Sequence, residues 1–384
     1  MDLYENQKQL PHVVYNHYQL AKNRMYPGID IAQKTANLSS LNKPTIISVM
    51  KVLVCKEPGT LIYIDRAKPE AGVGNTLLRI RRMGICGTDL HAFEGTQPYF
   101  NYPRVLGHEL AAEVVTSDGD FKKGDLVTVI PYINCQTCLA CRNGKPNCCS
   151  NIKVLGVHTD GGMAEYLEVP TRLLLPANGL SMDELVLVEP LAIGAHGIRR
   201  ASVQKNEFVL VVGAGPIGLG TMEFARIAGA KVIALDINDR RLAFCKDRLN
   251  VSYAINASTE DVMLRLQDIT GGDMPTVVID ATGSLKAINN AFQYMAHGAR
   301  YVLIGLQKGD ISFSHPEFHK REATLMSSRN ATREDFDHVL WAMKNKLVDP
   351  ANYITHRVKF DDVATEFHKW IDPANGVVKA MVEL

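Results

Sequence analysis

The chain has 384 residues, of which 46% are hydrophobic and 22% charged, with 42 Lys and Arg against 41 Asp and Glu. These proportions exclude a disordered or collagen-like chain, and this length predicts about two to three domains. The formal net charge of +1 removes the electrostatic drive for nonspecific binding to nucleic acid or to an anionic membrane. We therefore expect a small-molecule partner.

Residues 1–49 show no sustained apolar period, and a strand-like run begins at Met50. The first ten residues include Asp2 and Glu5 and lack an apolar core, so we expect no secretory signal and a cytoplasmic location. No apolar run reaches the ~18 residues that a membrane-spanning helix requires. Two explanations of the extension remain open: Met50 is the true start, or residues 1–49 form an arm that docks on a neighbouring subunit.

The residue pattern then changes twice along the chain. From residue 50 to about 194, short β-rich runs broken by Gly and Pro are typical of a partly open antiparallel barrel or sandwich. From 195 to 329, strands and helices alternate, and this βαβ pattern predicts a doubly wound parallel sheet. Residues 330–384 contain a helix-like segment and a strand-like end. An edge of the parallel sheet near residues 301–305 is a candidate for pairing between subunits.

A GxGxxG motif follows a predicted strand and opens a predicted helix. Glycines in this pattern permit the turn, the approach of a pyrophosphate and close helix–strand packing. Asp236 ends the next strand, where its carboxylate would bind the ribose hydroxyls and repel a 2′-phosphate, so NAD is favoured over NADP. Arg240 and Arg241 follow closely and could weaken that preference; a tight turn without ligand is the alternative interpretation of the glycines. The predicted cofactor contacts are Gly213, Gly215, Pro216, Ile217, Gly218, Asp236 and Arg241.

Five of the eight cysteines fall between residues 135 and 149. Four of them, Cys135, Cys138, Cys141 and Cys149, have the spacing of a closed structural zinc site, in which four thiolates leave no position for substrate. Cys148 is left as a spare thiol. An iron–sulfur cluster and inert cysteines are the alternatives.

A second group combines residue types that bind catalytic zinc, where three protein ligands leave one position open. Cys86, His108 and Glu189 are the candidates, with Glu109 beside His108. Each of them alone would more often be structural, since a lone cysteine usually behaves as a small buried hydrophobe. Their occurrence together, with a dinucleotide motif and a separate cysteine cluster, indicates a metal enzyme.

The motifs GICGTDLH, GHE, the four-cysteine cluster, VEPLAIGAHGIRR and VGAGPIG occur in this order. In this set the chain resembles the zinc-containing medium-chain alcohol and polyol dehydrogenases over nearly all of residues 50–384. The VEPLAIGAHGIRR stretch resembles the sorbitol dehydrogenase branch. The stretches YPRVLGHE, LGVHTDGGMAEY and HPEFHKREATLMSSRNAT resemble bacterial sugar-acid dehydrogenases of the L-galactonate and L-gulonate 5-dehydrogenase type.

The resemblance implies a GroES-like catalytic domain, residues 50–194 and 330–384, around a Rossmann domain of residues 195–329. It also implies two zinc ions per subunit, NAD, and a homodimer or homotetramer. The implied catalytic-zinc ligands are Cys86, His108 and Glu189, with Glu109 as an exchangeable ligand or near ligand. The implied proton relay joins Thr88 to His91, a side chain that titrates in the required range.

The implied reaction oxidises a secondary hydroxyl of a sugar acid to the 5-keto acid and transfers hydride to NAD. A polyol such as sorbitol or L-iditol, or L-threonine, is the nearest alternative substrate. A zinc-free quinone reductase and a binding protein without turnover are alternatives of other classes. A sugar acid needs a partner for its carboxylate, and Arg329 offers a bidentate fork. The candidates for that contact are His158, His319, Lys320 and Arg329.

Overall fold

The structure, a computed structural model, describes residues 48–98, 100–117 and 119–384. Nearly all of the extension predicted for residues 1–49 lies outside these ranges, and Val49 already begins the first strand. Within the described ranges, no helix is long and apolar enough to cross a membrane.

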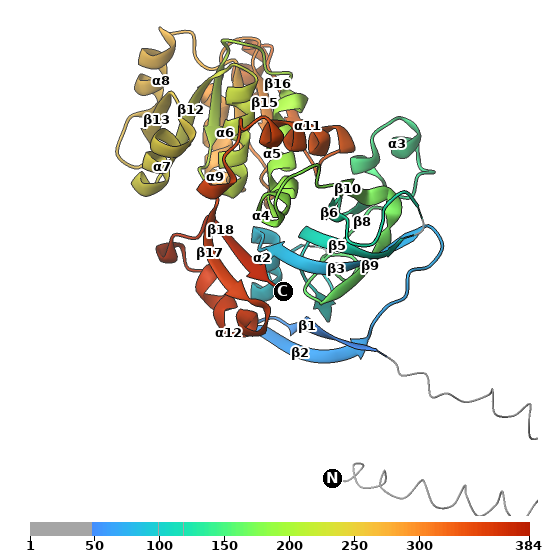
Figure 1. Ribbon diagram of the computed structural model, residues 1–384. Helices are drawn as coiled ribbons and strands as arrows, with labels where there is room; N and C mark the ends of the chain where they lie inside the picture. Colours follow the sequence, from blue (N-terminus) through green and yellow to red (C-terminus); the bar gives the residue numbers. More distant parts are fainter. Residues whose placement is uncertain (1–47, 99, 118) are drawn as a thin grey trace, which may run out of the picture. The chain divides into compact units, whose positions relative to one another are not determined.

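Six parallel strands in the described part of the chain form one sheet, in the order β13-β12-β11-β14-β15-β16 (Figure 1). The strands are β11 (Phe208–Val212), β12 (Lys231–Asp236), β13 (Tyr253–Asn256), β14 (Val277–Asp280), β15 (Arg300–Leu303) and β16 (Thr324–Ser327). The helices between them are α6 (Pro216–Ile227), α7 (Asp239–Leu249), α8 (Val262–Thr270), α9 (Leu285–Ala291) and α10 (His315–Lys320). The predicted doubly wound sheet is confirmed.

Both faces of this sheet are buried. In β11, Val209 and Val211 belong to the core that includes α6 and α7, whereas Leu210 and Val212 belong to the core beneath α8 and α9. Successive side chains of a strand point to opposite faces. A strand covered on both sides is therefore apolar throughout, which explains the unbroken run at residues 208–212.

The other strands build a β-rich domain around a mostly antiparallel sheet in the order β10-β6-β5-β3-β18-β17, with β9 also on β3. Its strands are β3 (Asn75–Gly84), β5 (Glu109–Ser117), β6 (Leu126–Val129), β9 (Tyr166–Pro170), β10 (Leu174–Pro176), β17 (Ile354–Lys359) and β18 (Lys379–Glu383). Two smaller sheets comprise β1 (Val49–Glu57), β2 (Thr60–Ala67) and β4 (Arg104–Val105), and β7 (Tyr132–Ile133) with β8 (Lys153–Val154). The helices outside the parallel sheet's crossovers are α2 (Gly87–Glu94), α3 (Leu139–Arg142), α4 (Met182–Val186), α5 (Val188–Ala201), α11 (Arg333–Lys344) and α12 (Val363–Glu366).

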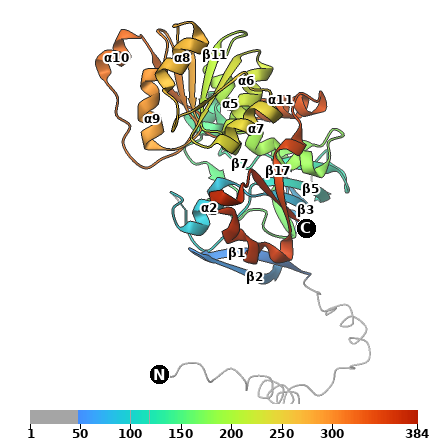
Figure 2. The same ribbon diagram turned by 90° about the vertical axis from the view of Figure 1, so that its left-hand side faces the viewer.

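The C-terminal segment, residues 330–384, contacts both helix α5 and the β-rich sheet. Its helix α11 packs on α5, whereas β18 pairs with β3 and so returns the chain end to the β-rich sheet (Figure 2). The helix predicted within residues 330–384 and the strand at the chain end are both present. The limits assigned to the two domains remain a prediction.

The expected exposed edge near residues 301–305 was misplaced. Strand β15 pairs with β14 on one side and β16 on the other, and Tyr301 and Val302 are fully buried. The edge belongs to β16, whose Leu325 is exposed. The strand β16, TLMS, is only four residues long and has a polar residue at each end, so it lacks the apolar run that predicts a buried strand.

Helices α5 and α6 approach most closely at two glycines. A Cβ added at Gly194 would lie 2.6 Å from the backbone nitrogen of Thr221, whereas one at Gly220 would meet the Leu191 Cδ2 methyl at 3.1 Å. A backbone atom cannot move aside as a side-chain methyl group can. Gly194 therefore tolerates an added Cβ less well than Gly220 does.

We expect Gly194→Ala to lower the free energy of unfolding by about 1–3 kcal/mol, because the helices must separate. Urea unfolding of the purified variant measures this. Gly220→Ala is the matched control on the same interface, and it should cost less. Equal losses in both variants would contradict the assignment of the contact to backbone.

Candidate active site and metal centres

The structure brings Cys86, His108 and Glu109 together, with one possible ligand atom from each within 4.8 Å of the others. Cys86 is the N-cap of α2, and Glu109 begins β5 opposite Gly84 of β3. A Cβ at Gly84 would lie 1.9 Å from Glu109 Oε2. The carboxylate therefore folds back over β3 only because residue 84 is glycine.

Asp89 ties the two ligand-bearing loops together. Its carboxylate accepts hydrogen bonds from the backbone N–H of Cys86 (2.9 Å) and of Gly107 (3.0 Å). The same carboxylate lies 3.8 Å from His108 Nδ1, an arrangement typical of metal-binding histidines, whose second nitrogen faces a carboxylate. Burial opposes the charged form of His108, but the negative charges of Asp89 and Cys86 outweigh it and hold the pKa well above its ordinary value.

Lys379 is the buried cation of the site. It is 3% exposed, comes from β18, and donates to Glu109 Oε1 (2.5 Å) and to the carbonyl of Ile85 (3.2 Å). Burial lowers the pKa of Lys379, but Glu109 and Cys86 outweigh burial, so the net shift is upward. The second oxygen of Glu109, Oε2, is buried without a partner among the described residues. An unpaired buried carboxylate oxygen beside a thiol and an imidazole suits the sulfur, nitrogen and oxygen ligands of zinc.

Glu189 lies near this group without belonging to it. The structure does not bring its carboxylate within 4.8 Å of all three other ligand atoms. Glu189 is 4% exposed in the first turn of α5, and its Oε1 accepts a hydrogen bond from the Tyr132 hydroxyl. Burial raises the pKa of Glu189, and the Glu109 carboxylate adds to this rise against the opposing charge of His108.

Thr88 and His91 lie on α2, but the structure does not join them by a hydrogen bond. Thr88 is half-buried. The ring of His91 is exposed and lies 3.2 Å from Glu94 Oε2 and 3.4 Å from Thr96 Oγ1. The predicted relay is therefore not assembled in this conformation.

The four cysteines of the predicted closed site do converge, with their sulfur atoms within 4.8 Å of one another. Hydrogen bonds from the backbone N–H groups of Cys141 and Ser150 lower the pKa of Cys138 to about 5. None of these cysteines forms a disulfide, and Cys148 is exposed outside the group. Four convergent cysteine sulfurs match the ligand set of a closed structural zinc site.

The glycine loop has the conformation of a dinucleotide-binding turn. Gly213 has φ +101°, and a Cβ at Gly218 would lie 1.9 Å from the Gly213 carbonyl oxygen. Gly215 caps α6, is followed by Pro216 and Ile217, and a Cβ there would meet no atom within 4 Å. The conformation and packing of the backbone thus require glycine at residues 213 and 218, whereas Gly215 faces open space.

Asp236 already has partners on the protein. Its carboxylate accepts hydrogen bonds from the backbone N–H of Ala214 (2.7 Å) and of Asn238 (2.9 Å), and Arg241 Nη1 lies 4.0 Å away. These contacts join the glycine loop to the end of β12 and hold the carboxylate where a ribose would need it.

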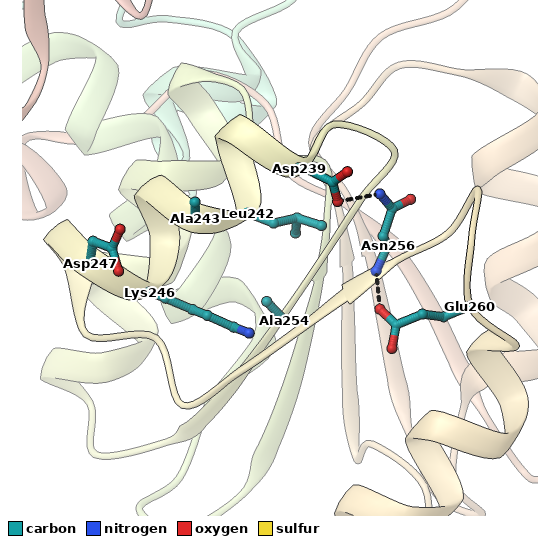
Figure 3. Close-up of a pocket in the computed structure, with 8 residues that line it drawn as sticks. All are labelled: Asp239, Leu242, Ala243, Lys246, Asp247, Ala254, Asn256 and Glu260. Carbon is teal, nitrogen blue, oxygen red and sulfur yellow. Dashed lines mark hydrogen bonds between the residues drawn. The ribbon is translucent and has the colours of Figure 1, made fainter.

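A pocket of ≈ 270 Å³ lies between α7 and β13 (Figure 3). Asn256 at its upper end donates to Asp239 Oδ1 (2.6 Å) and its backbone N–H donates to Glu260 Oε1 (2.7 Å). No glycine of the loop lines this pocket, so it is distinct from the dinucleotide turn. Two of its three carboxylates, those of Asp239 and Glu260, are already hydrogen-bonded to Asn256.

The side chains suggested for a substrate carboxylate lie in two places. His158 is exposed, and its Nδ1 accepts from the backbone N–H of Val154 (3.1 Å). Burial and the positive charges of Arg329 and Arg104 lower the pKa of His158, so these three groups share one region. His319 and Lys320 are exposed on α10, where Lys320 lies 3.9 Å from a glutamate of the same helix.

A buried polar network anchors α5 to neighbouring segments. Asp335 is 1% exposed and accepts hydrogen bonds from His196 Nδ1 (2.8 Å), Arg199 (2.6 and 2.9 Å) and Thr332 (2.8 Å from each of its N–H and hydroxyl). The amide of Asn147, next to the four-cysteine group, contacts His196 Nε2 (3.2 Å) and donates to the Arg329 carbonyl (3.0 Å). Sequence reasoning missed this network, although its histidine and arginines stand in VEPLAIGAHGIRR.

Comparison with known proteins decides the family. An alcohol dehydrogenase GroES-like domain matches residues 72–179, and a zinc-binding dehydrogenase domain matches residues 216–345. The chain is 43% identical to L-galactonate-5-dehydrogenase of Escherichia coli (strain K12) over 339 residues, which is 88% of this chain and 99% of that protein. The chain belongs to the zinc-binding alcohol dehydrogenase family.

Other relatives support this placement. A sorbitol dehydrogenase of Halalkalibacterium halodurans is 30% identical over 83% of this chain and 95% of that protein. The crystal structure of the alcohol dehydrogenase RspB from Escherichia coli CFT073, complexed with NADH, is 30% identical with a TM-score of 0.82, covering 88% of this chain and all of that one. The resemblance inferred from the motifs is confirmed, as is the GroES-like plus Rossmann fold, and the chain is an oxidoreductase of the zinc type.

The Asp335 network yields a stability prediction. We expect Asp335→Asn to lower the free energy of unfolding by about 1.5–3 kcal/mol at neutral pH, because hydrogen bonds to a charged group are lost. Burial opposes ionisation of Asp335, but Arg199 and His196 outweigh it and depress its pKa. A depressed pKa gives stability that is present above the unfolded value of ~3.9 and lost as pH falls towards the folded value.

The difference between wild type and variant should therefore be constant from pH 5 to 8 and shrink below about pH 4. Denaturant unfolding across this range measures it. Asp337→Asn, at an exposed position of the same helix, is the control and should stay within about 0.5 kcal/mol. Equal effects of the two substitutions would contradict the prediction.

Proposed function

We propose that this enzyme uses NAD and catalytic zinc to oxidise a secondary hydroxyl of a sugar acid, of the L-galactonate or L-gulonate type, to the 5-keto acid. The observation that carries the proposal is the buried Glu109 oxygen without a partner, beside Cys86 and His108. The 43% identity to L-galactonate-5-dehydrogenase supports the substrate. A polyol dehydrogenase or an L-threonine 3-dehydrogenase is the second candidate, because relatives with those names are 30% identical.

Cys86, His108, Glu109 and Glu189 would hold the catalytic zinc, and Cys135, Cys138, Cys141 and Cys149 a second, structural zinc. When bound, the catalytic ion would lower the pKa of the substrate hydroxyl, and NAD would supply the acceptor for the hydride of the carbinol carbon.

The chain's own residues prepare this site. Lys379 holds one oxygen of Glu109, and Asp89 orients both ligand loops and the His108 ring. Thr88 Oγ1 takes the hydroxyl proton, and the exposed ring of His91 releases it to solvent. Since these two side chains are not hydrogen-bonded to each other here, a water molecule or a rotation of Thr88 must complete the path.

Three groups are suited to the substrate carboxylate. Arg329 has no side-chain partner among the described residues, His158 can donate through Nε2, and Arg104 has a buried Nε without a partner. Asp160 balances only part of this charge, because it is shared between Arg104 (3.3 Å) and Arg66 (2.8 Å). A surplus of positive charge favours an acid over a neutral polyol.

Two further proposals concern the molecule as a whole. Self-association into a homodimer or homotetramer would use the edge of β16, since exposed strand edges pair readily. Eight cysteines without a disulfide support a cytoplasmic location.

A substitution at Gly215 tests cofactor binding without changing the packing of the fold. Because a Cβ there meets no protein atom within 4 Å, we expect Gly215→Ala to keep the melting temperature of the wild type. The added methyl would occupy the approach of the pyrophosphate, at a cost of about 1–3 kcal/mol, or roughly 5- to 150-fold in the Kd for NAD. Fluorescence titration with NADH measures the affinity, and unchanged affinity would contradict the cofactor assignment.

The substrate proposal is tested by steady-state kinetics on aldonates, hexitols and L-threonine with NAD and NADP. We expect an aldonate to have the highest kcat/KM, and Arg329→Met to reduce that value roughly 10- to 150-fold through loss of a charge-assisted hydrogen bond. Hexitol oxidation should change little in the same variant. A hexitol preferred over every aldonate by the wild type would overturn the assignment, and no turnover with any panel member would overturn the function itself.

A further inference from the structure

The carboxylate of Glu189 depends on one tyrosine. The Tyr132 hydroxyl donates to Glu189 Oε1, and both residues are buried, at 5% and 4% exposure. The other oxygen, Oε2, accepts no hydrogen bond from the residues that the structure describes. One fixed oxygen sets the orientation of the whole carboxylate, since the group is planar and its carbon chain is already packed.

The same arrangement recurs at Glu109. There Lys379 holds Oε1, and Oε2 is left without a partner. Each of the two buried carboxylates therefore has one oxygen fixed by a buried donor and one left over. Hydrogen bonds of this kind orient metal-binding carboxylates in proteins.

Tyr132 is itself firmly placed. It lies in β7, which pairs with β8, and its ring meets Phe336 of α11 edge-on at a centroid distance of 6.2 Å. Cys135 of the four-cysteine group follows three residues later. From the other end of that group, Asn147 contacts His196, two helical turns beyond Glu189 on α5.

Residues 132–149, here called the four-cysteine segment, thus contact α5 at two points. Tyr132 contacts the carboxylate of Glu189, and Asn147 contacts His196. We propose that Tyr132 is a positioning residue that holds Glu189 for the catalytic zinc and is itself placed by the four-cysteine segment. This inference rests on the proposed zinc chemistry and adds a role for the structural site, which is to aim a ligand of the catalytic one.

The test is zinc release from the purified holoenzyme to a chromogenic chelator, with the wild type, Tyr132→Phe and Tyr301→Phe compared. The phenylalanine keeps the ring and removes only the donor. Tyr301 of the parallel sheet is the matched control, because its buried hydroxyl donates to the backbone carbonyl of Ile288 on α9 (3.0 Å). We expect Tyr132→Phe to weaken one of two zinc sites by roughly 10- to 100-fold, to leave the other unchanged, and to shift the visible spectrum of cobalt placed in the weakened site.

A second experiment compares Glu189→Gln with the double variant that also carries Tyr132→Phe. If Tyr132 acts through Glu189, the double variant should bind catalytic zinc no more weakly than Glu189→Gln alone. Unchanged or tighter zinc in Tyr132→Phe, equal weakening of both zinc sites, or additive losses in the double variant would each overturn the inference. A wild type that binds one zinc, unaffected by Cys86→Ser, would instead overturn the proposed function.

Discussion

The arrangement of the site follows from one constraint, which is that it buries more carboxylates than positively charged side chains. Glu109, Glu189 and Asp89 are all at most 4% exposed, and the buried Lys379 interacts with the first two of them. Removing charges from water costs several kcal/mol for each ion unless they are paired. The protein pairs one oxygen of Glu109 and leaves the other unpaired beside a thiol and an imidazole. In the proposed zinc site, a divalent cation would complete this charge balance.

This charge cluster is assembled from remote parts of the chain, and that determines how much of it the sequence could reveal. The convergence of the four cysteines and the position of the glycine loop before a helix were predictable, because the residues of each set lie within a few positions of one another. Their roles as zinc ligands and cofactor contacts remain predictions. Cys86, His108 and Glu109 were predicted because they stand in compact motifs. Their convergence follows from the pairing of β3 with β5, which places Gly84 opposite Glu109.

The residues that orient those ligands were not predicted, since they act across long separations. Tyr132 reaches Glu189 across 57 positions, and Lys379 reaches Glu109 across 270. A lysine inside the apolar run VVKAMVEL was a signal, because a strand buried in a sheet rarely carries an unpaired charge. Asp89 stood within GICGTDLH, but its role depends on the loop at Gly107. Conversely, Thr88 and His91 lie three residues apart on one helix, but they form no hydrogen bond with each other, because the His91 ring turns to Glu94.

Helix α5 joins the metal site to the cofactor turn. Its first turn carries Glu189, its middle meets α6 at Gly194, and its later residues are bound to α11 through Asp335. Helix α6 in turn begins at Pro216, with Gly215 of the glycine loop as its N-cap. Because residue 194 is glycine, the backbones of α5 and α6 pack directly against each other at this point, with no side chain between them. Hydride transfer needs reacting atoms held about 3–3.5 Å apart. The contact of these two helices therefore links the position of the Glu189 carboxylate to that of the glycine loop.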